Sequence, residues 1–178
     1  YHYLAMEYVD GENLRLVLKR GGPLPEARAL TIAFQVAQAL EHALCKNVIH
    51  RDVKPENIML DRSGAAKLLD MGLACAANVE ERQQDAASPG APAAQEARRA
   101  VGTPHYISPE AAQGLEDVDT RADIYSLGCT LYHLLTGHTP FEAESSAAVM
   151  ARHLVDQVPD PRARRPEISA TAAAILAK

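Results

Sequence analysis

The sequence predicts a mainly α-helical fold of the α+β class, in which a small β-hairpin accompanies the helices. Two observations favour this class. Alanine, the residue with the highest helix propensity, occurs 32 times among the 178 residues. Apolar side chains also recur at helical spacing over long stretches, whereas strand-like runs are short. A hydrophobic content of 47% is ordinary for a globular protein and excludes global disorder.

The first quarter of the chain is expected to hold one strand and two helices. Residues 3–9 are β-prone and end at the turn signal Asp10-Gly11. Residues 13–20 fit a short helix that stops at two glycines. From residue 25 to residue 46 the apolar spacing predicts a long helix with a core-facing stripe of Leu30, Phe34, Ala37, Leu40 and Leu44.

The middle of the chain predicts short strands around a polar loop. Residues 48–49, 58–60 and 67–69 are short apolar runs. Because residues 61–64 read as a polar turn, the last two runs are expected to pair as a hairpin. Residues 76–100 contain only one large aliphatic side chain, Val79, so they are expected to be a flexible insertion.

The second half predicts three helices. Residues 119–136 form an apolar helix that stops at Gly137, residues 145–157 form another, and a last helix begins near Ser169 after a linker at 159–166. The apolar side of the first of these helices is expected to comprise Ile124, Leu127, Leu131, Leu134 and Leu135.

Charge and cysteine content exclude several classes of protein. A net charge of −5 argues against binding nucleic acid through bulk charge. The three cysteines, Cys45, Cys75 and Cys129, are too far apart for a disulfide framework or a zinc knuckle, so a cytoplasmic setting is expected. No apolar run reaches the roughly 18 residues of a membrane span, and an anchor outside this chain stays open. Both ends look truncated, so a fragment is expected.

The residues with chemistry lie in one polar segment and one short motif after it. The segment reads His50-Arg51-Asp52-Val53-Lys54-Pro55-Glu56-Asn57, and Asp70-Met71-Gly72 follows the hairpin. Two carboxylates and an amide oxygen form a hard-oxygen set that suits Mg²⁺. A lysine among them suits a phosphate. The pattern therefore indicates a site for a metal ion and a phosphate.

Several motifs in this order resemble the C-terminal lobe of a eukaryotic-type (Hanks-type) serine/threonine protein kinase of the bacterial kind. They are the hinge at 6–9, the catalytic loop at 50–57, the metal-binding triplet at 70–72, the substrate-side segments at 102–104 and 108–110, and the central helix at 119–137. The resemblance implies a protein kinase-like, two-lobed α+β fold. Residues 1–10 would end the small lobe, and residues 11–178 would form the mainly α-helical large lobe with its catalytic-loop hairpin.

The resemblance also implies an activity, the transfer of the ATP γ-phosphate to Ser or Thr of protein substrates. Asp52 would be the catalytic base, and Lys54 would neutralise charge on the γ-phosphate. Asn57 and Asp70 would hold two Mg²⁺ ions. Thr103 would lie near Asp52 and favour Ser or Thr as the acceptor.

Further positions would bind adenine or support the loop. The backbone of Glu7 and Val9 would bind adenine, with Met6 behind the pocket and Met59 as its floor. His50 would pack as an interior histidine, Arg51 would pair with an activating phosphate, and Asp123 would grip the catalytic-loop backbone. Asp123 has a local alternative, because Thr120-Arg121-Ala122-Asp123 fits a capping box.

The activation segment departs from the family pattern. Ser88 is the only hydroxyl residue between Leu73 and Gly102. We therefore expect activation without a loop phosphate, and Ser88 is the alternative phosphosite.

This sequence also lacks elements that the family places before the hinge: the Gly-rich loop, a strand lysine and a helical glutamate. The N-terminal lobe would have to be supplied in cis, and the chain alone is expected to be inactive. Glu110 is expected to be buried without an arginine partner. The family's partner arginine lies further along the chain, and Arg162, Arg164 and Arg165 come too early in the sequence for that role. Such a carboxylate costs roughly 3–5 kcal/mol, so the isolated chain is expected to be marginally stable.

Three rival interpretations remain. The chain could belong to a pseudokinase or interaction module, or it could be a non-functional truncated product. A metal-dependent phosphatase or nuclease would also use Asp52 and Asp70, but it does not explain the hinge and the segments at 102–104 and 108–110.

Overall fold

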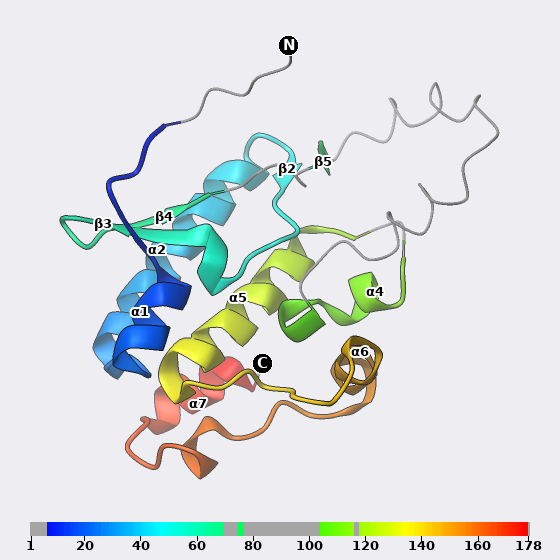
Figure 1. Cartoon of the computed structure of the whole chain (residues 1–178). Helices are drawn as coiled ribbons and strands as arrows, with labels where there is room; N and C mark the ends of the chain where they lie inside the picture. The colour runs from blue at the N-terminus through cyan, green and yellow to red at the C-terminus, as the bar shows by residue number, and fades with distance from the viewer. Residues whose placement is uncertain (1–6, 70–74, 77–103, 116–117, 178) are drawn as a thin grey trace, which may run out of the picture.

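The computed structural model of this chain describes residues 7–69, 75–76, 104–115 and 118–177. It is mainly helical with a small antiparallel sheet, as the sequence predicts (Figure 1). Met6, Asp70, Ser88, Thr103 and residues 77–100 of the expected insertion lie outside the described residues. The elements, with η for a 3-10 helix, are β1 (Gly11–Asn13), α1 (Leu14–Gly21), α2 (Glu26–Leu44), β2 (Val48–Ile49), η1 (Pro55–Asn57), β3 (Ile58–Asp61), β4 (Ala66–Leu68), β5 (Cys75–Ala76), η5 (Pro104–Tyr106), α4 (Pro109–Ala112), α5 (Thr120–Thr136), α6 (Ser146–Val155), η6 (Pro161–Ala163) and α7 (Ala170–Leu176).

Helix α5 lies at the centre of the molecule and packs against α2, α4, α7 and η5 (Figure 1). Its composition explains this position, because apolar side chains and small polar ones are buried around most of its circumference. Four of the five predicted apolar residues of α5 are buried, whereas Ile124 is 55% exposed. Gly137 ends the helix in the left-handed conformation, with φ of 78°, as the sequence predicts.

The predicted helix α2 is confirmed, and its predicted core-facing stripe is correct only in part, because Leu40 is buried and Leu30 and Ala37 pack against the core while partly exposed. Phe34 is 64% exposed and Leu44 is 46% exposed, and only Leu40 of the predicted stripe is fully buried. The buried face is built from smaller residues, which let α5 approach closely. They are Ala29, Ile32, Ala33, Val36, Leu40 and Ala43.

The small sheet has the strand order β1-β3-β4, and all its pairs are antiparallel. The β3–β4 hairpin is the one that the sequence predicts. Its turn is closed by Asp61, whose Oδ1 accepts hydrogen bonds from the backbone N–H of Ser63 and Ala65.

The strand predicted at 3–9 is not confirmed in its described part, because residues 7–10 have no regular structure. The strand instead forms at Gly11–Asn13, where the sequence predicts a turn. Gly11 allows this strand because it has no side chain, so its backbone can approach β3 closely. A Cβ at this position would lie 2.0 Å from the carbonyl oxygen of Leu60. A second small sheet pairs β2 with β5, so Ala76 begins the expected insertion as a strand residue.

Side-chain caps fix the starts of the helices. Asn13 caps α1, Ser145 caps α6 and Ser169 caps α7. Helix α5 is capped by Asp119, whose Oδ1 accepts a hydrogen bond from the backbone N–H of Arg121 at 2.8 Å. The capping box starting at Thr120 is therefore wrong, and the Asp123 side chain has other partners.

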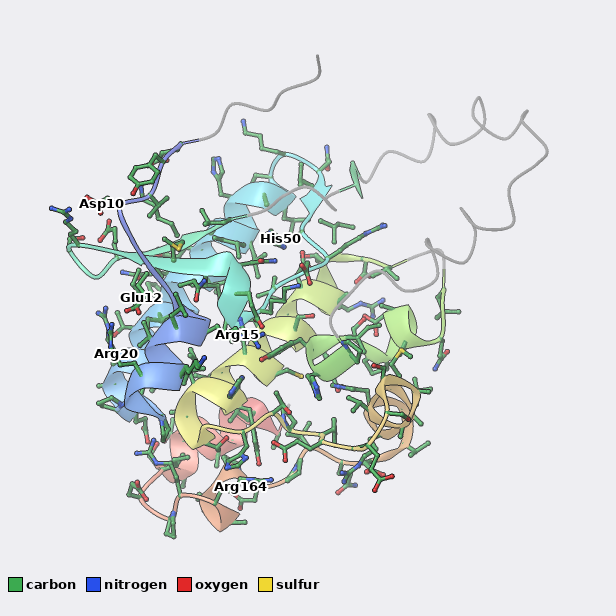
Figure 2. All side chains as sticks on the ribbon, in the orientation of Figure 1. Asp10, Glu12, Arg15, Arg20, His50 and Arg164 are labelled. Atoms are coloured by element: carbon green, nitrogen blue, oxygen red, sulfur yellow. The ribbon has the colours of Figure 1, made fainter. Side chains whose placement is uncertain are left out.

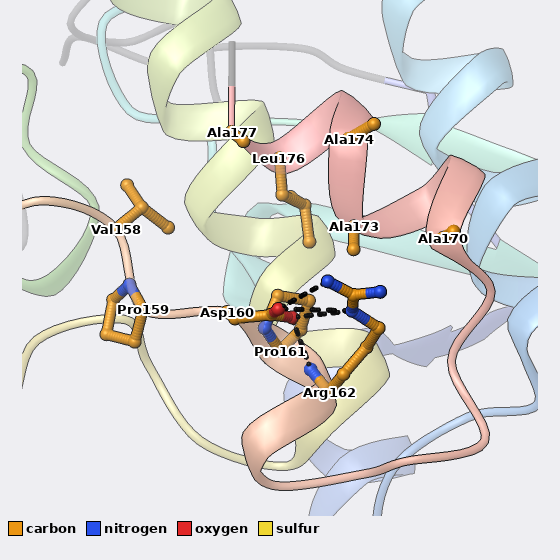
Figure 3. Close-up of a pocket in the computed structure, with 10 residues that line it drawn as sticks. All are labelled: Val158, Pro159, Asp160, Pro161, Arg162, Ala170, Ala173, Ala174, Leu176 and Ala177. Carbon is orange, nitrogen blue, oxygen red and sulfur yellow. Dashed lines mark hydrogen bonds and ion pairs between the residues drawn. The ribbon is translucent and has the colours of Figure 1, made fainter.

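The chain after α6 differs from the expected linker because residues 161–163 form η6. Together with α7, this segment lines an open pocket of about 260 Å³, in which Asp160 pairs with Arg162 (Figure 3). Glu110, in α4, is half-buried rather than buried, so the expected cost of a buried, unpaired carboxylate does not apply to it. In the part of the chain that the structure describes, no helix is both long and apolar enough to cross a membrane.

Candidate active site in the loop between β2 and β3

The loop that follows β2 is anchored to the central helix α5 by one carboxylate. Asp123 Oδ2 accepts a hydrogen bond from the backbone N–H of His50 at 2.8 Å, and Oδ1 accepts one from Arg51 at 2.7 Å. Asp123 is only 2% exposed. Arg51 has a φ of 66°, which costs energy for a residue with a Cβ. The two hydrogen bonds that Asp123 accepts offset this cost and hold the loop in a strained shape.

His50 links the loop to the strand that leads to Asp70. Its side chain is fully buried, as expected for an interior histidine. The Nδ1 atom accepts from the backbone N–H of Asp52 at 3.3 Å, so Nε2 carries the proton and donates to the carbonyl of Leu69 at 2.8 Å. The N–H of Leu69 in turn donates to the carbonyl of Asn57 at 2.8 Å. The residue before Asp70 is thus tied to both ends of the loop.

Three predicted site residues meet at the carboxylate of Asp52. Lys54 Nζ lies 2.7 Å from Asp52 Oδ2, and Asn57 Nδ2 donates to the same oxygen at 2.8 Å. The side chains of Lys54 and Asp52 are 19% and 12% exposed, so solvent screens their attraction only partly. This arrangement presents a cation, a carboxylate and an amide on one side of the loop.

The orientation of Asn57 fits a metal ligand. Its amide nitrogen donates both to Asp52 Oδ2 and to the Asp52 carbonyl, at 2.9 Å. The amide oxygen must therefore point away from Asp52, and oxygen is the atom type that Mg²⁺ prefers. The structure thus fits one of the two predicted metal ligands, and the other, Asp70, lies outside the described residues. Within those residues no group of three or more His, Cys, Asp or Glu side chains could hold a metal ion.

Two further contacts of the loop were not predicted from the sequence. Thr130 of α5 is fully buried, and its hydroxyl donates to the carbonyl of Val53 at 3.4 Å. Arg15 of α1, which is labelled in Figure 2, forms an ion pair with Glu56 of η1. The first contact could have been predicted, because a threonine among the leucines of a buried helix needs a hydrogen-bond partner for its hydroxyl. The second joins residues 41 positions apart, and no local pattern indicates it.

Two of the predicted adenine-binding residues, Glu7 and Met59, contact or belong to the small sheet. Glu7 is exposed and forms an ion pair with Lys67 of β4. Val9 is half-buried, and Met59 lies half-buried in the central strand β3, where it pairs with Asn13 and Lys67. The structure therefore brings the described part of the hinge to the strand that carries Met59.

The segment that follows Thr103 is fixed on α5. Ser126 Oγ donates to the carbonyl of Tyr106 at 2.7 Å, and the Tyr106 hydroxyl lies 2.7 Å from His133 Nδ1. Burial, and to a smaller extent the nearby Glu56 carboxylate, raise the pKa of Tyr106. Burial lowers the pKa of His133. Both side chains are therefore neutral near pH 7, so a neutral hydrogen bond holds η5 in place.

Known proteins resemble this chain over nearly its whole length. It is 42% identical to the serine/threonine-protein kinase PknB of Mycolicibacterium smegmatis over 99% of this chain and 27% of that protein. It is 41% identical to the serine/threonine-protein kinase pkn3 of Myxococcus xanthus, over 93% of this chain and 29% of the relative. A probable serine/threonine-protein kinase of Streptomyces coelicolor, SCO3848, is 40% identical over 99% of this chain and 24% of its own length.

The chain therefore spans about a quarter of the length of these curated relatives. The family model of the protein kinase domain matches residues 1–178. This match covers the catalytic loop, the anchor on α5 and the small sheet alike. The chain belongs to the protein kinase domain family.

Proposed function

We propose that the protein containing this chain transfers the γ-phosphate of ATP to Ser or Thr of protein substrates, with Mg²⁺ as its metal. The observation that carries this proposal is the contact of Lys54 and Asn57 with one carboxylate oxygen of Asp52. The names of the three relatives, each a serine/threonine-protein kinase, support the same reaction.

Asp52 acts in this proposal on the acceptor hydroxyl. Its Oδ2 is engaged by Lys54 and Asn57, so Oδ1 is the atom that receives the hydroxyl proton. Because the transition state of phosphoryl transfer is loose, orienting the hydroxyl matters more than strong basicity. The anchors on Asp123 and His50 keep Asp52 in the orientation that this step needs.

Lys54 and Asn57 act on the phosphate side. The Lys54 ammonium supplies positive charge for the transferring phosphoryl group. The Asn57 oxygen, together with Asp70, would hold the two Mg²⁺ ions, which neutralise the phosphate charge when they are bound. His50 keeps Leu69, the residue before Asp70 in the sequence, beside Asn57.

The rest of the nucleotide site is proposed to come from an N-terminal lobe of the same polypeptide. The relatives are about four times as long as this chain, which leaves room for that lobe. A cytoplasmic location fits the proposal, because Cys45 is a free, exposed thiol and such thiols persist in reducing compartments.

The test is Asp52→Asn in the full-length protein. We expect phosphate transfer from radiolabelled ATP to a protein substrate to fall by at least about 100-fold, as is typical when a catalytic acid–base group is removed. The melting temperature should hardly change, because asparagine keeps one side-chain oxygen for Lys54 and Asn57. Asp160→Asn, the same change at the exposed carboxylate that caps η6, should leave activity unchanged.

The rival interpretation as a pseudokinase makes a different prediction for the same assay. If the full-length wild-type protein binds ATP with Mg²⁺ but transfers no phosphate, the proposed function is wrong. Equal activity of wild type and Asp52→Asn would also contradict it.

A further inference from the structure

The ion pair between Arg15 and Glu56 joins helix α1 to the turn that ends the catalytic loop. Arg15 Nη1 contacts Glu56 Oε1, and α1 packs against η1 (Figure 2). The two residues are 41 positions apart, so the pair ties the turn to a separate element of the fold. Neither side chain has a part in the proposed phosphate transfer.

The two side chains of this pair differ in exposure. The Arg15 side chain is 67% exposed, whereas that of Glu56 is only 25% exposed. Glu56 Oε2 is buried and has no hydrogen-bond partner within the described residues. In the same part of the chain, Arg15 is the only side chain that pairs with the Glu56 carboxylate. Because a largely buried charge without a partner is costly, η1 should lose stability when Arg15 is replaced.

The place of Glu56 is coupled to that of Asn57, because both belong to the short turn η1 (Pro55–Asn57). The N–H of Asn57 donates to the carbonyl of Lys54 at 3.0 Å, and its carbonyl accepts from the N–H of Leu69 at 2.8 Å. The Asn57 amide nitrogen donates twice to Asp52, which turns the amide oxygen away from that residue. A rotation of Glu56 in so short a turn would therefore also displace the Asn57 amide.

The other anchors of the loop act before this turn. Asp123 holds the backbone of His50 and Arg51, and Thr130 holds the carbonyl of Val53. All these contacts come from α5, whereas Arg15 reaches the loop from α1 at its other end. The Arg15–Glu56 pair therefore supplies a side-chain anchor at the end of the loop that carries Asn57.

We propose that Arg15 is a positioning residue for the metal site: it neutralises the Glu56 carboxylate and so holds η1 in the conformation in which Asn57 offers its amide oxygen to Mg²⁺. This inference rests on the proposed function, which names Asn57 as a ligand of Mg²⁺. Arg15 differs from a catalytic residue, because it acts through Glu56 and η1 and touches neither the nucleotide nor the acceptor.

The test measures how the full-length protein binds a non-hydrolysable ATP analogue at increasing Mg²⁺ concentration. Arg15→Met removes the charge and keeps a similar helix propensity. It should raise the Mg²⁺ concentration for half-maximal binding about fivefold, at the upper end for an ion pair with one partly buried partner. Binding of the analogue in EDTA should stay within about twofold of wild type. Arg15→Lys, which keeps the charge, should stay within the same range.

A matched variant controls for general loosening of α1. Arg20 lies on the same helix, is 71% exposed and pairs with Glu12, which is 32% exposed. Arg20→Met should leave the Mg²⁺ dependence unchanged, because Glu12 lies in β1 and not in η1. If Arg20→Met weakens Mg²⁺ binding as much as Arg15→Met, or if Arg15→Met leaves it unchanged, the proposal is overturned.

A double-mutant cycle tests whether Arg15 acts through Glu56. Glu56→Gln removes the charge that Arg15 neutralises, so adding Arg15→Met to it should change the Mg²⁺ dependence by less than about twofold. A further fivefold loss in that background would overturn the proposal. In the metal-free protein, hydrogen exchange of the Asn57 amide should be faster in Arg15→Met than in wild type or Arg20→Met, and equal rates would contradict the coupling.

Analogue binding separates this inference from the proposed function. If wild type binds the analogue with Mg²⁺ but phosphorylates no protein, the proposed function fails, and the ratio of Arg15→Met to wild type still decides the role of Arg15. If binding by wild type does not depend on Mg²⁺, the role of Arg15 at a metal site is excluded.

Discussion

Asp123 shows how one side chain can determine the shape of a functional loop. It accepts hydrogen bonds from two consecutive backbone N–H groups, although it lies 73 residues after His50 in the chain. Both donors belong to residues that precede Asp52, and Arg51 has a positive φ. Without the carboxylate, the strained backbone would relax and Asp52 would lose its orientation.

The first prediction concerns this carboxylate. Asp123→Asn should lower the free energy of unfolding by about 1.5–3 kcal/mol, because hydrogen bonds to a buried charged acceptor are lost. Urea unfolding and phosphate transfer of the full-length protein measure the effect, and both should decrease. Asp119→Asn is the control, since Asn and Asp are equivalent N-caps, and it should change little. Similar losses in the two variants would contradict the assignment.

A second residue-scale prediction concerns pH and the contact between α2 and α7. The Ser169 hydroxyl donates to Glu26 Oε1 at 2.6 Å and its N–H to Oε2 at 2.8 Å, and these bonds lower the pKa of Glu26. A carboxyl whose pKa is lower in the folded state stabilises the fold above its unfolded pKa, about 4.3. This stabilisation is lost as the pH falls through the folded pKa.

The measurement compares two cap substitutions. Ser169→Ala and Ser145→Ala each remove a helix N-cap, but only Ser169 contacts a carboxylate. Melting curves should show that the deficit of Ser169→Ala shrinks as the pH is lowered below about 4.3. The deficit of Ser145→Ala should stay constant. A deficit of Ser169→Ala that is independent of pH would argue against the Glu26 contact.

At the scale of elements, the strand β1 depends on a residue without a side chain. Gly11 lies against the backbone of β3, where any Cβ would meet Leu60 O at 2.0 Å. The strand carries the chain from residues 7–10, beside the small sheet, into α1. Its register with β3 therefore fixes where the described part of the hinge lies.

The third prediction follows from this close approach. Gly11→Ala should destabilise the protein by about 1–3 kcal/mol, because β1 or β3 must shift. Hydrogen exchange should become faster for the amides of β1 and β3. Gly21→Ala is the matched control, because a Cβ there meets no atom within 4 Å, and alanine favours the helix end. Protection of β1 in Gly11→Ala equal to that of wild type would rule out the steric argument.

At the scale of the whole molecule, the fold places the catalytic loop and the turn η5 on one helix, α5. The catalytic loop contacts α5 through Asp123 and Thr130, and η5 contacts α5 through Ser126. Because α5 packs on α2 and α7 as well, the whole helical core supports the site.

The fourth prediction concerns activation of the whole protein. We expect phosphate transfer to be independent of phosphorylation in the segment that contains Ser88, since that segment has no other hydroxyl residue. Ser88→Ala in the full-length protein should keep wild-type activity, and mass spectrometry should find no stoichiometric phosphate at Ser88. The prediction is wrong if the wild-type protein carries a phosphate at Ser88 and the Ser88→Ala variant is inactive. Arg51 would then pair with that phosphate.

The sequence alone determined the elements that depend on local signals. The helices α1, α2, α5, α6 and α7 follow from apolar spacing and from caps such as Ser169 and Gly137, and the β3–β4 hairpin follows from its polar turn. The cluster of Asp52, Lys54 and Asn57 was also predictable. These residues are close together in one loop, so their side chains lie near each other however the rest of the chain packs.

Only the tertiary structure decided which faces and which distant partners meet. Phe34 is larger than Ala33, yet Ala33 is buried, because close packing of α2 on α5 favours small side chains. Strand β1 forms where a turn was predicted, because pairing with β3 supplies backbone hydrogen bonds that no local signal encodes. Arg15 with Glu56, Thr130 with Val53, and His153 with Tyr125 are contacts between separate elements. Sequence patterns report periodicity and turns, whereas such contacts depend on how the completed elements pack.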